Sequence, residues 1–524
     1  MLVMTWNDRS NDGGLLDGMM GTHDEETLDY FAGSGVICAN VPRTKKSWLG
    51  LGGTFVSTCY THHQKTIIMD APPVKAGNQR RLVAFLGGLD ITDGRYDSPE
   101  FPLFSTIKTL HEGDFYQNCT PGASADCGPR QPWHDIHCRL EGPAARHVAQ
   151  NFMERWTNQN PDQVDSLLAL EELELDLAGQ VDSSAGGGWR VRILRSITSD
   201  SAELDIAREK FLHRKYGNMI DNSIERAYVR LIRAAEDFIY IENQYFLGSA
   251  YSWLKEKDTL THHIIPMELT EKIISKIRSG EEFKVYICIP MYPEGDPSSA
   301  ASQEILYWQW STMEAMYTKI AVALREAGAG GDCHPQDYLN FYCLGKREGP
   351  DDVPDYLHSP DAGSPAETVR QTLRHPIYVH SKLMICDDRD ILLGSANINQ
   401  RSLGGNRDSE ICLEARQPSS LTTGGVHTFR LALWSAHIGG YRDSIRQPGT
   451  ARCLQEVRKI AADNWAGYVS PTPEASKVHL LPYPVMVERQ GRVSALARPH
   501  HTFPDTTASV LGTKSGFLPA KLTT

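Results

Sequence analysis

The chain has 524 residues, of which 40% are hydrophobic and 23% are charged, a composition typical of a globular protein. This length exceeds one typical domain, so we expect two cores or one large two-lobed unit. The formal net charge of -12 argues against sequence-independent binding to nucleic acid and gives no long-range attraction to an anionic membrane. No apolar run approaches the ~18 residues that a membrane span needs.

The N-terminal stretch and the cysteines both bear on the compartment. Residues 1–8 lack a basic region and a long apolar core, so they do not resemble a signal peptide. The 11 cysteines are scattered without a Cys-x-x-Cys pair, and several lie inside predicted strands. This pattern favours reduced, buried thiols in a cytoplasmic protein over a disulfide framework or a zinc site.

The first part of the chain mixes predicted strands, helices and one unusual loop. A strand at 1–8 is followed by a polar helix within 15–31. The Gly-rich loop 45–53 sets a Trp and two Leu beside two Lys, so it either dips into a lipid interface or folds against its own domain. Further on, 133–140 is predicted as one strand, and helical spacing of apolar residues predicts a helix at 143–156.

The second part alternates strands with helices, which indicates an α/β layered fold. An acidic and Gly-rich stretch, 159–187, separates it from the first part as a connection between two lobes. The predicted strands are 189–194, 238–246 and 283–290, and the predicted helices are 224–235, 269–277, 302–327, 426–437 and 453–468.

One β-rich stretch carries polar residues that buried strands rarely hold. It contains His380-Ser381-Lys382 and ends at Asp387, and the next strand leads into Gly394-Ser395-Ala396-Asn397. Because side chains alternate along a strand, His380 and Lys382 share one face, roughly 7 Å apart, whereas Asp387 has the opposite parity. We therefore assign the chemistry to the His and the Lys, and a supporting role to the Asp.

The same pattern occurs once earlier in the chain. His63, Lys65 and Asp70 have the same spacing, and Gly87-Gly88-Leu89-Asp90 follows on a second β-rich run. A single match is a weak signal, but two matches, each followed by Gly-Gly or Gly-Ser, reveal an internal repeat. Alignment of the two halves also places Asp135 opposite Glu410, each at the start of an apolar strand. A carboxylate at the same place in both repeats predicts a partner for each histidine.

Paired His-x-Lys-x4-Asp motifs are the signature of the phospholipase D superfamily, which this sequence resembles. Over nearly its whole length it is similar to the catalytic region of plant phospholipase D of the alpha type. Four further stretches carry the resemblance: Gly394 to Ser402, Ile239 to Phe246, Trp133 to His137 and Leu511 to Ser515. The resemblance implies two pseudo-repeated α/β/α sandwich lobes, with mixed sheets flanked by helices and an active site at the lobe interface.

The resemblance also divides the chain. We expect a first lobe at 1–180, a second lobe at 188–415 and an extension at 416–524 that packs on the second lobe. The strand at 1–8 aligns with 283–290, which is preceded in its own half by a strand and two helices. The first lobe is therefore expected to lack its opening elements, and the resembled family also carries an upstream C2 domain. We interpret the chain as an N-terminally truncated form.

The resemblance implies hydrolysis of phosphatidylcholine, phosphatidylethanolamine and related lipids to phosphatidic acid and a free head group. One histidine attacks phosphorus to form a phosphohistidine, and the other protonates the leaving alcohol and then activates water. By analogy we assign His63 as the nucleophile and His380 as the acid and base; the intermediate also predicts transfer to primary alcohols. The implied catalytic residues are His63, Lys65, Asp70, His380, Lys382 and Asp387, the substrate-binding residues are Ser395, Asn397, Gly88 and Asp90, and the supporting residues are Asp135 and Glu410.

Cofactor, partner and alternative functions follow from the same resemblance. Calcium is the family's usual activator, and its effect is expected to weaken without the C2 domain; the chemical step is expected to need no metal. We expect peripheral contact with membrane phospholipids from the cytoplasm and no nucleic-acid partner. Two alternatives stay open: a nuclease-type phosphodiesterase of the same superfamily, which the negative net charge disfavours, and a truncated form that acts only in binding.

Overall fold

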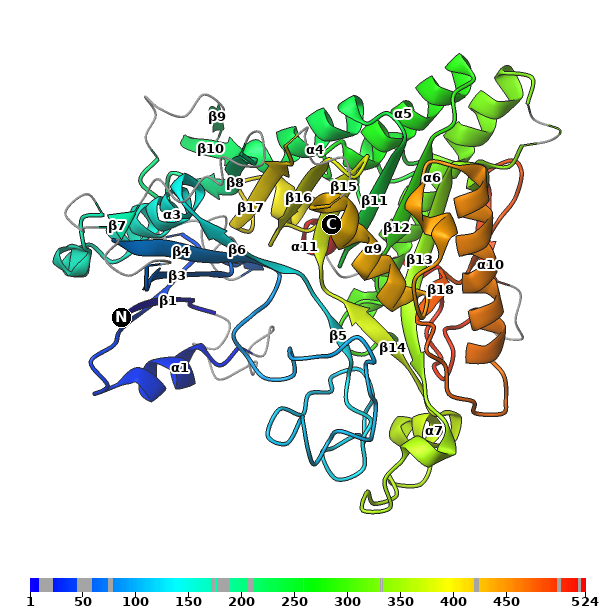
Figure 1. Cartoon of the computed structure of the whole chain (residues 1–524), viewed down its shortest axis with the longest axis horizontal. Coiled ribbons are helices and arrows are strands. Elements are labelled where there is room, and N and C mark those ends of the chain that lie inside the picture. The colour runs from blue at the N-terminus through cyan, green and yellow to red at the C-terminus, as the bar shows by residue number, and fades with distance from the viewer. Residues whose placement is uncertain are drawn as a thin grey trace.

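The computed structural model describes residues 1–8, 22–44, 59–73, 79–170, 175–176, 188–204, 212–215, 217–257, 259–329, 331, 333–418, 424–496, 501–516 and 520–524. A large mixed sheet occupies the middle of the molecule, and a smaller sheet from the first half lies beside it (Figure 1). The loop at 45–53, for which the sequence left lipid contact open, lies outside the described residues.

The large sheet has 12 strands in the order β5-β14-β13-β12-β11-β15-β16-β17-β8-β10-β9, with β18 paired to β13. The strands are β5 (Trp133–His134), β8 (Arg190–Thr198), β9 (His213–Lys215), β10 (Asn218–Asn222), β11 (Phe238–Asn243), β12 (Lys284–Cys288), β13 (Leu339–Arg347), β14 (Arg374–Val379), β15 (Lys382–Cys386), β16 (Asp390–Gly394), β17 (Glu410–Arg416) and β18 (Leu480–Pro482). Strands β11 to β13 run parallel, and β15, β16, β17 and β8 pair antiparallel.

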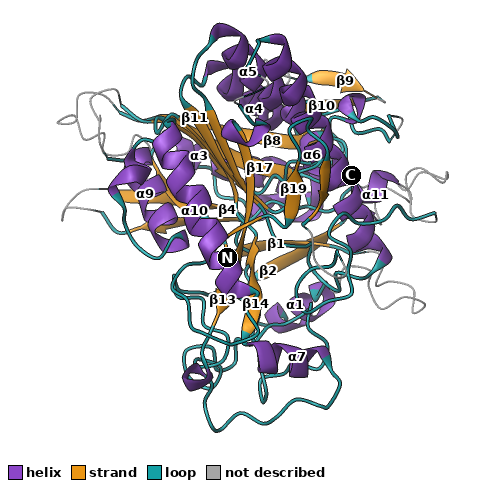
Figure 2. Cartoon of the chain, turned by 90° about the vertical axis from the view of Figure 1, so that its right-hand side faces the viewer, coloured by secondary structure: helices purple, strands orange, loops and turns teal. Residues whose placement is uncertain are grey.

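Helices cover both faces of this sheet (Figure 2). Helices α4 (Ser223–Ala234), α5 (Ile265–Ser279) and α6 (Ala300–Glu326) pack on one face, and α9 (Val426–His437) and α10 (Ala451–Tyr468) pack on the other. Side chains alternate along β11 and so point to both faces of the sheet. Ile239 and Ile241 pack in the core with α4, α5 and α6, and Phe238 and Tyr240 pack in the core with α9 and α10. Burial of the central strands on both faces explains their continuous apolar sequence.

Most predicted elements of the second half are confirmed to within a few residues. The short elements were not predicted, because few residues define each of them. They include α7 (Pro365–Thr372), α8 (Gln400–Leu403), α11 (Ala520–Thr523), β19 (Val485–Val487), β20 (Val493–Ala495) and the 3-10 turns at 161–166, 250–252, 335–337, 350–352 and 443–446. The longer strand β13 was not predicted either.

The first half contributes two small sheets. Strands β3 (Thr66–Ala71), β4 (Arg80–Gly87) and β6 (His137–Glu141) pair antiparallel, and β7 (Leu175–Asp176) joins β4. Helix α3 (Pro143–Gln159) packs on the inner face of this sheet, in the same core as α9 and α10. Strands β1 (Leu2–Trp6) and β2 (Ile37–Val41) form a separate parallel pair beside α1 (Asp24–Phe31).

The run 133–140 was predicted as one strand, and this prediction is wrong. Strand β5 pairs with β14 of the large sheet, whereas β6 pairs with β4 of the small sheet. Between them the Ile136 backbone N–H donates to Oδ1 of Asp135 at 2.8 Å. This N–H group is therefore not available for hydrogen bonding to a neighbouring strand. The chain therefore crosses from one sheet to the other at Asp135.

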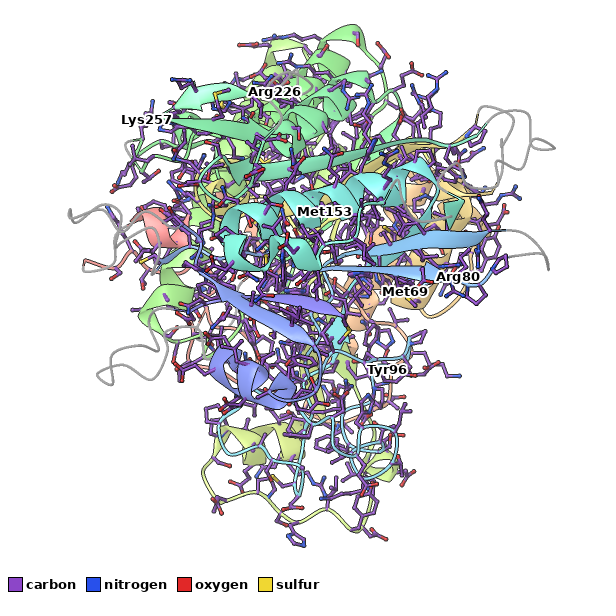
Figure 3. All side chains as sticks on the ribbon, turned by 90° about the vertical axis from the view of Figure 1, so that its left-hand side faces the viewer. Met69, Arg80, Tyr96, Met153, Arg226 and Lys257 are labelled. Atoms are coloured by element: carbon purple, nitrogen blue, oxygen red, sulfur yellow. The ribbon has the colours of Figure 1, made fainter. Side chains whose placement is uncertain are left out.

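The motif strands of the two halves differ in what covers them. Met384 and Cys386 of β15 are buried at 0% and 2% exposure. The aligned positions in β3, Ile67 and Met69, are 43% and 50% exposed, and Figure 3 marks Met69 on the small sheet. The outer face of β3 is thus open to solvent in the described structure.

Two further expectations concern membranes and thiols. Within the described part of the chain, no helix has both the length and the apolar character needed to cross a bilayer. The 11 cysteines are free thiols, in agreement with the reduced state predicted for them.

Candidate active site

The two His-x-Lys motifs are each anchored to a strand of the other half of the chain. The backbone N–H of His63 donates to the carbonyl of Ser409 at 2.9 Å, immediately before β17. The backbone N–H of His380 donates to the carbonyl of His134 in β5 at 2.8 Å. Backbone hydrogen bonds of this kind fix main-chain positions without depending on rotamers, so the motifs meet where the halves cross over.

Each histidine ring contacts a buried carboxylate from the other half. Nδ1 of His63 lies 3.0 Å from Oε2 of Glu410, and Nδ1 of His380 lies 2.7 Å from Oδ2 of Asp135. Because Nδ1 is engaged in both rings, Nε2 is left for chemistry. Alignment of the halves had singled out these same two carboxylates, and the structure shows that the pairing crosses between the halves.

Glu410 is itself held from two sides. The hydroxyls of Ser395 and Ser402 each donate to one of its oxygens at 2.6 Å. Ser395 was expected to bind substrate, but its fully buried hydroxyl orients Glu410 instead. Gly88, also expected at the substrate, leaves room for the other carboxylate, since a Cβ there would lie 2.2 Å from Oδ1 of Asp135. Both residues thus support a histidine partner.

The two lysines fold back on the motifs that contain them. Nζ of Lys65 donates to the carbonyl of His63 at 3.0 Å and forms an ion pair with Asp90 at 3.1 Å. Nζ of Lys382 donates to the carbonyl of His380 and to Oε1 of Gln244, the latter at 2.9 Å. Two ammonium groups beside two imidazoles suit an anionic phosphoryl group.

Asn397 completes this part of the site. Its Nδ2 donates to Oε1 of Gln244 at 3.1 Å, whereas its buried Oδ1 has no hydrogen-bond partner. A buried amide oxygen without a donor is costly unless a ligand supplies one. Asn397 is therefore the expected substrate-binding residue that the geometry supports best.

Burial controls the charges of the second motif. Burial, reinforced by Lys382, lowers the pKa of His380 to about 4, so its ring is neutral near pH 7. Burial also lowers the pKa of Lys382 to about 7. Although burial acts to raise the pKa of Asp90, Lys65 and His380 hold it far below its usual range. The carboxylate of Asp90 is thus a permanent anion beside Lys65.

The aspartates of the two motifs lie away from the histidines, which corrects their expected place in the catalytic set. Asp387 follows β15, so it lies roughly 17 Å along the strand from Lys382. Its carboxylate accepts hydrogen bonds from the backbone N–H groups of residues 236, 237 and 238 at 2.8 to 3.0 Å. Asp70 forms an exposed ion pair with Arg80. Each motif strand begins near the histidine, so the aspartate at its other end lies too far away to contact the reacting groups.

Three residues of the site were missed by sequence reasoning. Gln244 holds both Lys382 and Asn397, and its place directly after a fully buried strand that carries polar residues was the available signal. The ring of Trp133 lies 4.8 Å from that of His380, with the guanidinium of Arg95 3.9 Å over the indole. Trp133 precedes Asp135 in a stretch that carried the family resemblance, but nothing in the sequence pointed to Arg95.

Comparison with known proteins agrees with this geometry. The family model for Phospholipase D matches residues 1–512. The chain is 43% identical to Phospholipase D alpha 2 of Arabidopsis thaliana and 44% identical to Phospholipase D alpha 1 of Zea mays, in each case over 100% of this chain and 67% of the relative. It therefore spans about two thirds of the length of these relatives.

Among solved structures, the chain is similar to the phosphatidylserine synthase of Haemophilus influenzae Rd KW20. That likeness has 14% sequence identity and a TM-score of 0.40, over 89% of this chain and 83% of the other, and we draw no conclusion from it. The family match and the plant relatives, by contrast, extend over nearly the whole chain and include both motifs. This chain belongs to the phospholipase D family.

Proposed function

We propose that this chain hydrolyses phosphatidylcholine, phosphatidylethanolamine and related glycerophospholipids to phosphatidic acid and a free head group. The observation that carries the proposal is the crossed pairing of His63 with Glu410 and of His380 with Asp135, with two lysines beside them. A phosphodiester is an anion with a poor leaving group, so its cleavage needs a nucleophile, an acid and positive charge. The site offers all three from its own side chains.

The proposed reaction has two steps. Nε2 of His63 attacks phosphorus, the bond from phosphorus to the head-group oxygen breaks, and His380 gives that oxygen a proton. His380 then takes a proton from water, which attacks the phosphohistidine and releases His63. Glu410 stabilises the positive charge that develops on the His63 ring, while Lys65 and Lys382 neutralise the phosphoryl oxygens.

The acid step requires a proton on His380, whose pKa in the free protein is about 4. A phosphodiester bound beside the ring adds negative charge, which favours the imidazolium and raises that pKa. We infer that His380 gains its proton together with the substrate. Identification of the phosphorylated histidine tests this assignment, since the reverse assignment predicts a phosphate on His380.

The family also implies calcium, and the one cluster of candidate metal ligands among the described residues does not fit it. Where side chains are described, one group of His, Cys, Asp or Glu gathers three ligand atoms within 4.8 Å: His134, Glu242 and His437. Two nitrogens and one carboxylate do not fit Ca²⁺, which takes 6–8 oxygen ligands. The proposed steps therefore use only the side chains named above.

Membrane contact and lobe boundaries complete the proposal. Because the substrates are membrane lipids and the thiols are reduced, we infer peripheral contact with a membrane from the cytoplasm. We also infer a first lobe at 1–180, a second lobe at 188–415 and an extension at 416–524. Packing of α9 and α10 on the large sheet supports the last of these.

The experiment compares substrates on one preparation. Vesicles of phosphatidylcholine and a single-stranded oligonucleotide are offered in parallel, to the unaltered chain and to His63→Asn. We expect phosphatidic acid from the vesicles, an intact oligonucleotide and no turnover by His63→Asn. The matched control is His23→Asn, an exposed histidine whose ring contacts Glu26 of its own helix, which should keep full activity. Full turnover by folded His63→Asn, or cleavage of the oligonucleotide alone, contradicts the proposal.

A further inference from the structure

A second polar network lies buried next to the proposed active site, and the mechanism above does not use it. Its centre is Glu242 of β11, whose side chain is 0% exposed. Oε2 of Glu242 accepts hydrogen bonds from Nε2 of His134 and from the hydroxyl of Ser381, both at 2.7 Å. Oε1 accepts from the hydroxyl of Tyr240 at 2.6 Å.

Two groups in this network belong to the segments that carry the chemistry. Ser381 lies between His380 and Lys382. His134 precedes Asp135, and its backbone carbonyl accepts from the backbone N–H groups of His380 and Ser381 at 2.8 and 3.2 Å. A single oxygen of Glu242 therefore joins β5, which directly precedes Asp135, to the segment that bears the second motif.

The contact between Glu242 and His134 has the geometry of an ion pair. Burial acts to lower the pKa of His134, but the Glu242 carboxylate raises it above its ordinary value. Burial acts to raise the pKa of Glu242, but His134 lowers it to about 2. A buried charge is tolerated when it is paired and hydrogen-bonded, and Glu242 accepts three hydrogen bonds here. The other titratable groups that face the pair are Tyr240, Cys288, His437, Asp135 and Asp97.

His437 of α9 closes the network from the C-terminal part of the chain. Its Nδ1 lies 3.4 Å from the hydroxyl of Tyr240, and its Nε2 lies 3.8 Å from Oε1 of Glu242 without a hydrogen-bond partner. Burial lowers the pKa of His437 to about 3, so this ring is neutral. The network thus holds two histidines around one carboxylate, one with a raised pKa and one with a lowered pKa.

The distances decide between a proton and a metal ion at the centre. Two ligands of a tetrahedral zinc ion, each about 2.1 Å from the metal, lie roughly 3.4 Å apart. Nε2 of His134 and Oε2 of Glu242 are 2.7 Å apart, which is a hydrogen-bond distance. The geometry therefore fits a proton between these two atoms and not a shared metal ion.

We propose that Glu242 and His134 are positioning residues, a buried ion pair that holds Asp135 and Ser381 and thereby orients His380 for its chemistry. The inference rests on the proposed function. Neither residue touches the reacting atoms directly: His134 acts through Asp135 and its own carbonyl, and Glu242 acts through Ser381. Loss of the pair therefore lowers turnover more than it weakens substrate binding.

The first test is Glu242→Gln, which keeps the shape of the side chain and removes its charge. We expect kcat on phosphatidylcholine to fall about 10- to 100-fold, the range typical of residues that orient catalytic ligands, with KM changed less than about twofold. The matched control is Glu348→Gln, because Glu348 is also a buried carboxylate but contacts the backbone of Leu103. It should keep the turnover of the unaltered chain, and thermal melts by circular dichroism confirm that each variant is folded.

The second test reads the ion pair itself, through the ¹⁵N chemical shifts of the histidine rings. In the unaltered chain His134 should titrate above pH 6.5. In Glu242→Gln it should titrate below pH 6.5, because burial then acts without opposition. This titration needs no turnover, so it separates a failure of this inference from a failure of the proposed function.

Ser381→Ala keeps the inference testable where Glu242→Gln does not fold, since it removes only the hydroxyl that Glu242 holds. We expect it to lower kcat in the same direction. In the double variant, the two losses should be less than additive, because both remove the same connection. A folded Glu242→Gln with full turnover, or a His134 that titrates below pH 6.5 in the unaltered chain, would overturn the proposal.

Discussion

At the scale of single residues, the site is defined by which carboxylate each histidine reaches. Glu410 is fully buried and accepts hydrogen bonds from His63, Ser395 and Ser402. A carboxylate in this position fixes the tautomer of its histidine and stabilises the positive charge that forms during the attack. The aspartate of each motif, although part of the signature pattern, has no such contact.

Removal of the Glu410 charge should therefore impair the chemistry more than the fold. For Glu410→Gln we expect kcat on phosphatidylcholine to fall about 100-fold or more, because the His63 ring loses its counter-charge in the transition state. The control lies in the same strand: Glu414→Gln, whose partner is Arg230 at a distance from both motifs. Equal turnover by the two folded variants would contradict this role for Glu410.

At the scale of elements, the strand β15 has a catalytic end and a structural end. Lys382 begins the strand at the site, and Asp387, just beyond its other end, receives three backbone N–H groups before β11. Those donors lie at the start of a strand, where no ladder partner satisfies them. Asp387 thus fixes the position of β15 relative to β11. Strand β11 in turn carries Glu242, and Gln244 just beyond its end, to the site.

Asp387→Asn should accordingly lower stability and leave the chemistry intact. Loss of charge-assisted hydrogen bonds predicts a fall of about 1–3 kcal/mol in the free energy of unfolding, with kcat per folded molecule unchanged. Asp70→Asn, at the aligned and exposed position, should change stability by less than about 0.5 kcal/mol, since exposed ion pairs contribute little. Urea melts and turnover measured on the same samples check both. A large loss of kcat in folded Asp387→Asn would restore the aspartate to the catalytic set.

The sequence predicted the elements that have strong periodicity and missed what depends on long-range pairing. The two motifs, the helices of the second half and the carboxylates Asp135 and Glu410 all follow from local pattern and from the internal repeat. The break at Asp135 does not, because the run 133–140 is uniformly compatible with a strand. Arg95 reaches the site only through tertiary contacts, so no local pattern marks it, whereas Gln244 directly follows a buried strand that carries polar residues.

At the scale of the whole molecule, the fold keeps many histidines neutral inside its core. Burial lowers the pKa of His263, His375, His380 and His479 to about 4 and that of His437 to about 3. In the unfolded chain these rings titrate near pH 6.5. Unfolding therefore takes up protons in the window between about pH 4 and pH 6.5, whereas above that window these groups contribute no pH dependence.

The free energy of unfolding should therefore fall as the pH is lowered through this window. Each such histidine contributes a loss on the order of 1–2 kcal/mol by pH 5. Groups whose pKa is raised in the folded protein oppose this trend, among them His134 beside Glu242, and Glu348, whose pKa burial raises to about 7. Urea melts at pH 7.5 and pH 5.0 measure the difference. Equal or greater stability at pH 5.0 would show that the buried rings do not stay neutral in the folded protein.

The measurement that bears most directly on the whole account is the fate of the phosphatidyl group when two acceptors compete. A covalent phosphohistidine can be released by water or by a primary alcohol, so 1-butanol added to the phosphatidylcholine assay should divert phosphatidic acid into phosphatidylbutanol. Because both products arise from one intermediate, the total head-group release should equal the amount of that intermediate formed. His63→Asn should abolish both products together. An active preparation that forms phosphatidic acid but no phosphatidylbutanol would contradict the covalent mechanism on which the account rests.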